Sequence, residues 1–288
     1  MRFSIALLLA VFIVPMSACA SHIGKPTSPP PVAVETTFTV KTDVVYTPKD
    51  WPQVLKANIY LPDMAGPLPA VLLIHGGGWA APDRRKDMHS IAARLAKRGY
   101  VVVNATYRFA PQYTYPAPVD DLREALKSMH KHAAALKIDP NRVAAMGYSA
   151  GGHLAAMLGV LDGPPEVRVQ AVVDGAGPSD LRKFEEGTLV SEFLGGTQAQ
   201  VPQQFIDASP VTHVSKDDPP FFFYHGTLDL LVPDDHSRDF KAALDAVGVH
   251  TEWFKQHGLG HVTAFVNDGA AIDAALEFLD RELRSDPR

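Results

Sequence analysis

The chain has 288 residues, of which 46% are hydrophobic and 20% are charged, and its formal net charge at pH 7 is −5. This composition is typical of a globular protein, and the length fits one large α/β domain or two small ones. The mild negative charge, without an extended basic run, argues against nucleic acid as a partner.

Residues 1–18 predict an export signal. Arg2 supplies an early positive charge, the apolar run IALLLAVFIV follows, and MSA leads to a cleavage point. An apolar run of ten residues is too short to span a bilayer, which takes about 20 residues. We therefore expect this segment to be a signal peptide rather than a transmembrane helix.

The stretch MSAC resembles a bacterial lipobox, in which the cysteine is lipidated and becomes the mature N-terminus. Its cysteine, Cys19, is the single cysteine of the chain, so no disulfide is expected. We predict an exported cell-envelope lipoprotein, in the outer membrane or facing the periplasm, that contacts the membrane through its N-terminal lipid. A plain secretory signal, giving a secreted protein, is the alternative.

Residues 19–36 are rich in proline and small polar residues, which predicts a semi-extended spacer without a core. A regular pattern begins near Thr37, so residues 37–288 are expected to form the folded domain. Residues 38–46 and 54–62 predict an antiparallel strand pair, and residues 70–76 a strand buried on both faces.

From there, strand patterns alternate with helix patterns. This alternation predicts a mostly parallel sheet with right-handed crossovers and helices on both faces. The stretch 185–212 breaks the rhythm and is a candidate cap or lid, because long irregular stretches in compact domains usually carry function. The expected strands lie at 100–107, 142–148, 169–177, 219–226 and 250–256, and the expected helices at 88–99, 117–136, 150–161, 234–248 and 271–283.

The sequence GYSAG places Ser149 where a buried strand turns into a helix. Gly147 and Gly151 relieve the crowding of so sharp a turn, which lifts the hydroxyl above the carboxyl edge of the sheet. The N–H groups at the helix start face any negative charge that forms there. This pattern is a nucleophile elbow.

A nucleophilic serine needs a base, and the base needs a carboxylate that orients it. His261 is the preferred base, because two glycines loosen the loop before it. His257 lies directly at a strand end and is expected to be a surface or packing histidine. Asp229, at a strand-end turn, is the preferred carboxylate over the two aspartates after Pro233, Asp234 and Asp235, which look like helix N-caps.

The strand at 70–76 continues into HGGGW, residues 75–79. Glycine N–H groups can approach a tetrahedral oxyanion closely, and this element occurs in lipases and esterases. We predict an oxyanion hole formed by the N–H groups of Gly77, Gly78 and Ala150. Trp79 and Phe193 are candidate walls of the substrate pocket.

Several motifs occur in an order that resembles the α/β-hydrolase branch of hormone-sensitive-lipase-like esterases and acetyl-xylan or feruloyl esterases. The resemblance covers residue 68 to the C-terminus and implies the α/β-hydrolase fold, with nucleophile, acid and base at Ser149, Asp229 and His261. The segment before residue 68 lacks the long N-terminal helical cap of the lipase type, which favours the carbohydrate-esterase-like branch. The motifs are HGGGW, NATYRFAP, YPAPVDDL, RVAAMGYSAGGHLA, ASPVTHVSKDDPPFFFYHG, DLLVP and GHVTAF.

We therefore predict a serine carboxylic-ester hydrolase that acts on short-acyl esters, of small molecules or of acetylated or feruloylated carbohydrate, without a metal or organic cofactor. An amidase, peptidase or arylformamidase-like hydrolase with the same triad is one alternative. A catalytically silent envelope binding protein is the other, although an intact set of serine, aspartate and histidine argues against it.

Overall fold

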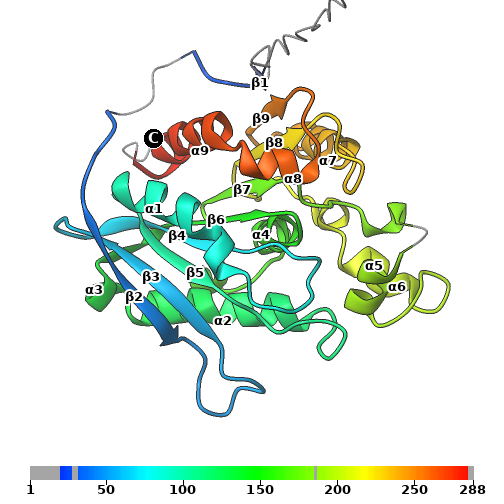
Figure 1. Cartoon of the computed structure of the whole chain (residues 1–288), viewed down its shortest axis with the longest axis horizontal. Helices are drawn as coiled ribbons and strands as arrows, with labels where there is room; N and C mark the ends of the chain where they lie inside the picture. Colours follow the sequence, from blue (N-terminus) through cyan, green and yellow to red (C-terminus); the bar gives the residue numbers. More distant parts are fainter. Residues whose placement is uncertain (1–19, 28–31, 185–186, 285–288) are drawn as a thin grey trace, which may run out of the picture.

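The computed structural model describes residues 20–27, 32–184 and 187–284. The signal peptide expected at 1–18 and the lipidation site expected at Cys19 lie outside these residues. Within them the chain forms a nine-stranded sheet (Figure 1). The strands are β1 (Ala20–Ile23), β2 (Phe38–Val45), β3 (Lys56–Pro62), β4 (Leu68–Ile74), β5 (Val101–Ala105), β6 (Ile138–Tyr148), β7 (Ala171–Gly175), β8 (Phe221–Gly226) and β9 (Thr251–Gln256).

The strands lie in the order β1-β9-β8-β7-β6-β4-β5-β3-β2. Strands β4 to β9 pair in parallel. The pairs β1–β9, β2–β3 and β3–β5 at the two sides of the sheet are antiparallel. This arrangement confirms the predicted α/β class with a mostly parallel sheet.

Helices cover both faces of the sheet. Apolar side chains of α1 and α9 pack on one face, and those of α2, α4 and α7 pack on the other. The helices are α1 (His89–Lys97), α2 (Ala117–Lys131), α3 (Ala133–Leu136), α4 (Ala150–Val160), α5 (Thr188–Leu194), α6 (Pro202–Asp207), α7 (Asp235–Ala246), α8 (His261–Val266) and α9 (Gly269–Arg284), with short 3₁₀ turns η1 (Arg85–Met88), η2 (Pro165–Val167), η3 (Leu181–Lys183) and η4 (Pro210–His213).

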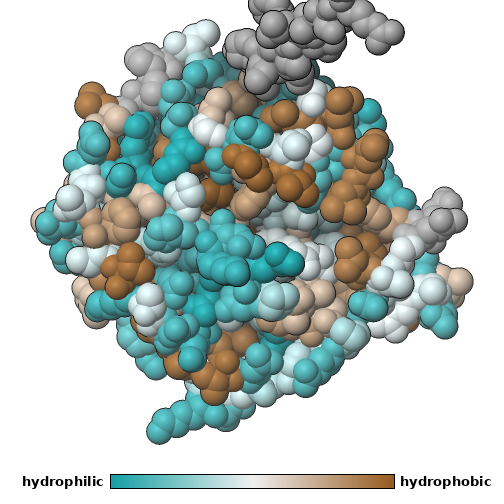
Figure 2. All heavy atoms as spheres, viewed as in Figure 1, coloured by the Kyte–Doolittle hydropathy of each residue, from teal (hydrophilic) through white to brown (hydrophobic). Residues whose placement is uncertain are grey.

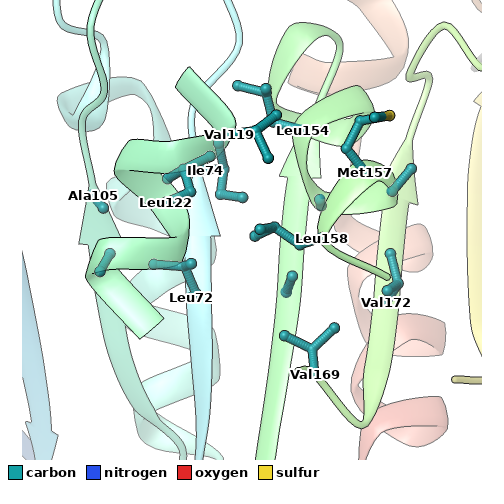
Figure 3. Close-up of a cluster of buried hydrophobic side chains, with 14 of the residues drawn as sticks. Leu72, Ile74, Ala105, Val119, Leu122, Leu154, Met157, Leu158, Val169 and Val172 are labelled. Carbon is teal, nitrogen blue, oxygen red and sulfur yellow. The ribbon is translucent and has the colours of Figure 1, made fainter. Parts of the chain in front are cut away.

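Strand β4 is apolar throughout because both of its faces are buried. Ala70, Leu72 and Ile74 point to the face covered by α2 and α4, whereas Val71 and Leu73 point to the face covered by α1 and α9. A strand buried on both faces has no polar side to alternate with. Figure 3 shows Leu72 and Ile74 among side chains of α2 and α4.

The prediction that residues 19–36 form a spacer without a core is wrong for residues 20–23. Residues 20–23 form β1, which pairs antiparallel with β9 at the edge of the sheet. His22 Nε2 lies 2.8 Å from the buried carboxylate of Glu252, and Arg281 binds the same carboxylate at 2.7 Å. The partners of this short polar strand come from the other end of the chain, so no local pattern could reveal it.

The Glu252 carboxylate connects three elements of the fold. Burial alone would raise its pKa, but hydrogen bonds from His22, His250 and Arg281 outweigh burial and lower the pKa to about 2. The carboxylate therefore stays ionised and holds β1, β9 and α9 together.

Other boundaries also differ from the expectation. The strand expected at 142–148 is β6, which begins at Ile138, four residues earlier. The long helix expected at 117–136 is divided at His132 into α2 and α3. The loop expected around His261 is in part a helix, α8, which begins at that residue. Gly260 in an extended conformation precedes it, and the Thr263 side chain accepts the Gly260 N–H at 2.8 Å, so the helix start is capped locally.

The irregular stretch expected at 185–212 contains α5, α6 and the start of η4. In Figure 1 these pieces lie beside the edge of the sheet at which the parallel strands end. No helix in the described ranges is long and apolar enough to cross a membrane.

Strand β1 can be tested by comparing a chain that begins at Ala20 with one that begins at Val34. The shorter chain exposes the edge of β9 and leaves Glu252 without His22, so we expect its thermal midpoint to be lower by about 5 °C, corresponding to roughly 2 kcal/mol. Thermal unfolding followed by circular dichroism measures the difference. Equal midpoints would mean that β1 contributes nothing to stability.

Candidate active site

Ser149 lies at the junction between β6 and α4, with φ 57° and ψ −125°. Such a conformation is strained for a residue with a side chain. Two backbone hydrogen bonds hold it, because the Ser149 N–H donates to Gly175 O at 2.7 Å and the Ser149 carbonyl accepts from the His153 N–H at 3.0 Å. The fold thus fixes the serine in the geometry of a nucleophile elbow.

The glycines on either side of Ser149 are required by close packing. A Cβ on Gly147 would collide with the backbone of Gly151, and a Cβ on Gly151 would collide with the carbonyl oxygen of Ile74 at the end of β4. The turn can approach β4 this closely only without side chains at these positions.

The structure brings His261 and Asp229 together, from the loops after β9 and β8. His261 Nδ1 lies 2.6 Å from Asp229 Oδ2, so the ring donates from Nδ1 and leaves Nε2 free as a proton acceptor. His261 also packs against the residue before the serine, since the Tyr148 hydroxyl donates to the His261 carbonyl at 2.6 Å. His261 is therefore tied to the end of β6, directly before Ser149.

The Asp229 carboxylate is buried but well satisfied. Its Oδ1 accepts the N–H groups of Leu231 and Val232, both at 2.9 Å. Burial would raise the pKa of Asp229, but hydrogen bonds from His225, His261 and the Val232 N–H outweigh burial and hold the pKa well below its usual value. The carboxylate is thus ionised at neutral pH.

His225 is a second histidine on the same carboxylate, and the sequence did not suggest this contact. Its Nε2 lies 2.8 Å from Val232 O and also 3.2 Å from Asp229 Oδ2. Its Nδ1 lies 2.8 Å from the Ser237 hydroxyl, which can donate to it. The sequence feature that could have indicated this contact is the spacing of four residues between His225 and Asp229.

The glycine loop 75–79 lies against the serine turn. A Cβ on Gly76 would lie 2.7 Å from Tyr148 O and 3.2 Å from Ser149 Cβ. Gly77 and Gly78 have φ values of 117° and 64°. Among the described residues, neither glycine N–H donates to a protein acceptor, and Gly78 lines the pocket beside Ser149.

His75 fixes the start of this loop. It is fully buried, its Nδ1 donates to Gly76 O at 2.8 Å, and its ring stacks on Tyr107 with the ring centroids 4.6 Å apart. Burial lowers the pKa of His75. The neutral ring therefore acts as a support of the loop.

A pocket of about 400 Å³ opens beside the serine. Among the residues that the structure describes, none in its wall carries a charged side chain, which suits an uncharged, apolar group. Ser149 and Ala150 lie at one end of it, and α5 supplies much of the far wall. The lining residues are Gly78, Trp79, Ser149, Ala150, Pro178, Phe184, Gly187, Thr188, Leu189, Val190, Leu231 and Val232.

The two aromatic wall candidates have different positions. Trp79 lines the pocket. Phe193 is not among the lining residues; it is fully buried behind Trp79, with the two rings stacked and their centroids 4.4 Å apart. The prediction that Phe193 lines the substrate pocket is therefore wrong, because Trp79 lies between Phe193 and the pocket.

Trp79 is held by a histidine that the sequence analysis did not single out. Trp79 Nε1–H donates to His153 Nδ1 at 3.1 Å, and His153 Nε2–H donates to Ala208 O at 2.7 Å. Burial lowers the pKa of His153 to about 4. The neutral ring thus connects the pocket wall to the segment after α6.

The other candidates lie apart from this group. His257 is exposed, and its Nε2 is 2.9 Å from the Ser21 hydroxyl of β1. Asp234 precedes α7 at its N-cap position, and Asp235 begins the helix. Among the described residues, no cluster of histidine, cysteine, aspartate or glutamate is placed to hold a metal ion.

A family model agrees with this arrangement. The model described as BD-FAE matches residues 57–244, more than half of the chain, and the match includes the glycine loop, Ser149 and Asp229. The chain belongs to the BD-FAE family. The match ends before His261, so this residue lies in the part of the BD-FAE chain that follows the matched region.

Curated relatives of this BD-FAE chain are esterases by name. The probable carboxylic ester hydrolase LipM of Mycobacterium tuberculosis is 33% identical over 194 residues, covering 62% of this chain and 45% of LipM. Esterase LipC of the same organism is 30% identical over 213 residues, covering 68% of this chain and 53% of LipC. The chain thus spans about half the length of these relatives.

Solved structures confirm the predicted α/β-hydrolase fold. A truncated form of a carbohydrate esterase from gut microbiota superposes with a TM-score of 0.79 at 26% identity, covering 90% of this chain and 100% of that one. The thermophilic esterase Est2 of the Planctomycetes species Thermogutta terrifontis superposes with a TM-score of 0.71 at 27% identity, covering 84% and 91%.

The neutral state of His153 predicts a pH dependence of stability. The histidine of the unfolded chain takes up a proton below about pH 6.5, whereas the folded one stays neutral until about pH 4. Stability must therefore be full above about pH 6.5 and decrease as the pH falls toward 4. In His153→Gln this contribution is absent, so its free energy of unfolding should fall less between about pH 7 and about pH 5, by roughly 2 kcal/mol.

The comparison uses thermal or denaturant unfolding of both proteins at the two pH values. Burial also lowers the pKa of His236 to about 4, but this residue is present in both proteins and its effect cancels. An identical pH dependence in wild type and variant would mean that His153 keeps an ordinary pKa in the fold.

Proposed function

We propose that this protein is a serine carboxylic-ester hydrolase with Ser149 as nucleophile, His261 as base and Asp229 as the carboxylate that orients it. The observation that carries the proposal is the 2.6 Å contact between His261 Nδ1 and Asp229 Oδ2 next to a serine in a strained elbow. The names of the relatives LipM and LipC agree with it.

The reaction proceeds in two halves. His261 Nε2 takes the proton of Ser149 Oγ while Oγ attacks the ester carbonyl carbon, and N–H groups of Gly77, Gly78 and Ala150 stabilise the oxyanion. The alcohol then leaves with the proton from His261. Water then gives a proton to His261 as its oxygen attacks the carbonyl carbon of the acyl-enzyme. His261 returns this proton to Ser149 Oγ as the bond between Oγ and the acyl carbon breaks, which releases the acid and restores Ser149.

We propose short-acyl esters as substrates. The pocket of about 400 Å³ is lined by apolar side chains from Phe184, Leu189, Val190, Leu231 and Val232, and its described lining residues include no cation that would bind a charged acyl group. We propose that the alcohol part of the ester is a carbohydrate, so that the substrate is an acetylated or feruloylated carbohydrate. The structural neighbour described as a carbohydrate esterase suggests this class.

The stretch predicted as a lid, 185–212, is proposed to control access to this pocket. Its described part supplies Gly187, Thr188, Leu189 and Val190 to the lining. Leu189 also contacts the glycine loop, since a Cβ on Gly78 would lie 3.1 Å from its methyl carbons. Movement of α5 would therefore open the pocket and the oxyanion loop together.

We also propose that the protein is exported and anchored in the cell envelope by a lipid on Cys19. The proposal rests on the lipobox-like MSAC and the apolar run before it. This location suits an enzyme that acts on material outside the cytoplasm.

Substitution of the proposed triad tests the mechanism. Ser149→Ala should remove nearly all esterase activity. Asp229→Asn should lower kcat about 10⁴-fold, because an amide in place of the carboxylate favours the wrong tautomer of His261. The matched control is Asp234→Asn, five residues later in the same loop, which should stay within about two-fold of wild type because its carboxylate only faces Lys255 at 3.7 Å.

The measurement is p-nitrophenyl acetate hydrolysis by chains that begin at Ala20, with thermal midpoints as a check on folding. If Asp229→Asn keeps activity within a few-fold of wild type while Asp234→Asn loses it, the orienting carboxylate is elsewhere. Labelling by a fluorophosphonate probe separates an activated Ser149 from a silent site.

A series of p-nitrophenyl esters from acetate to laurate tests the substrate class. We expect serine-dependent turnover that is highest at acetate to butyrate, because the pocket is apolar and small. Matched anilides should react much more slowly. Turnover of anilides without turnover of esters would overturn the esterase proposal in favour of an amidase, and no turnover by the folded protein would favour a binding role.

A further inference from the structure

An exposed apolar surface surrounds the mouth of the pocket. We call it the apolar rim. Its six side chains come from α5, the loop after β8, and α8, and each is between 43% and 94% exposed. Figure 2 shows hydrophobic side chains gathered over α8 and the neighbouring loops. The members of the apolar rim are Leu189, Leu228, Leu230, Leu231, Val262 and Val266.

The rim is continuous with the catalytic groups. Leu189 and Leu231 line the pocket itself. Leu228, Leu230 and Leu231 lie on either side of Asp229, and Val262 follows His261. The loop after β8 and the loop before α8 are joined, because the Leu228 N–H donates to Leu259 O at 2.9 Å.

The segments that carry the rim are almost free of charge. Residues 256–267 contain no lysine, arginine, aspartate or glutamate. Residues 227–233 contain only Asp229, which is buried, and α5 contains only Glu192. Large side chains exposed in a row without charges are unusual on a water-facing surface and mark an interaction site. The chemistry fits a partner that is apolar and needs no ion pair.

The position of β1 indicates which kind of partner the apolar rim contacts. Ala20 pairs with Gln256 at the carboxyl end of β9, and Gln256 Nε2 donates to Ala264 O within α8 at 3.1 Å. The first residue of β1 therefore lies beside the helix that carries part of the rim. Because Cys19 is bonded to Ala20, a lipid on Cys19 would tether the chain at this edge with no spacer between.

We propose that the apolar rim inserts into a lipid surface, so that the pocket mouth faces the membrane. The apolar rim is a feature of the structure, whereas the tether beside it depends on the lipid anchor proposed above. With a net charge of −5, attraction to anionic lipids is not the driving force. Apolar side chains would enter the boundary between headgroups and acyl chains, as on membrane-surface helices. An ester presented at the lipid surface would then reach Ser149 directly.

The test uses the unlipidated chain that begins at Ala20, which keeps all nine strands, because a lipid would mask the contribution of the rim. It is mixed with neutral phosphatidylcholine–phosphatidylethanolamine vesicles and floated on a density gradient. We expect a fraction to float at both about 0.1 M and about 1 M NaCl, since an apolar contact is not screened by salt.

The decisive variant is Leu230→Ser/Val266→Ser, two rim residues that do not line the pocket. Its partition onto vesicles should fall at least about ten-fold, because two exposed apolar side chains are lost from the contact. The matched control is Val54→Ser, at a valine that is 61% exposed in the loop between β2 and β3. It should float like wild type.

Readouts other than flotation separate this proposal from the proposed catalysis. Ser149→Ala should float like wild type, and the double variant should hydrolyse p-nitrophenyl acetate at the wild-type rate with an unchanged thermal midpoint. Absence of flotation by the wild type, or equal flotation by the double variant, would overturn the proposal. A dimer in solution that the double variant abolishes would assign the rim to a second copy of the chain instead.

Discussion

The site depends on a crowded junction where β4, β6 and the start of α4 meet without side chains between them. Gly147 faces the backbone of Gly151, and Gly151 faces the carbonyl of Ile74, so neither position has room for a Cβ. Ser149 is held between them at a positive φ that its side chain disfavours. Packing and hydrogen bonds from the surrounding sheet and helix hold the turn in place. The fold therefore tolerates the strained backbone conformation of Ser149.

The second constraint is the burial of Asp229. A buried carboxylate is costly unless donors surround it, and here two backbone N–H groups, His225 and His261 all face it. The tight turn that supplies the backbone donors has a further consequence. While it points the carboxylate inward, it leaves Leu230 outside, 94% exposed. The same turn thus orients the base and builds part of the apolar rim.

The elements predicted from sequence are those whose signal is local. The buried strands, the elbow around Ser149 and the order of Asp229 and His261 follow from short patterns. Strand β1 could not be found in this way, because its partners lie more than 200 residues away at β9 and α9. His153 was not predicted for a similar reason, since its role depends on contacts with Trp79 and Ala208. Phe193 was predicted as a pocket wall, but the sequence did not show that Trp79 would stack in front of it.

Topology places the proposed membrane tether and the proposed catalytic site at one edge of the sheet. In a parallel sheet the carboxyl ends of all strands meet at one edge, which is where Ser149, Asp229 and His261 follow their strands. Strand β1 runs antiparallel to β9, so its amino end lies at that edge. A parallel β1 would begin at the opposite edge, roughly 15–20 Å away for strands of five or six residues, and the tether would hold the pocket away from the bilayer. The direction of one short strand therefore decides which way the proposed site faces.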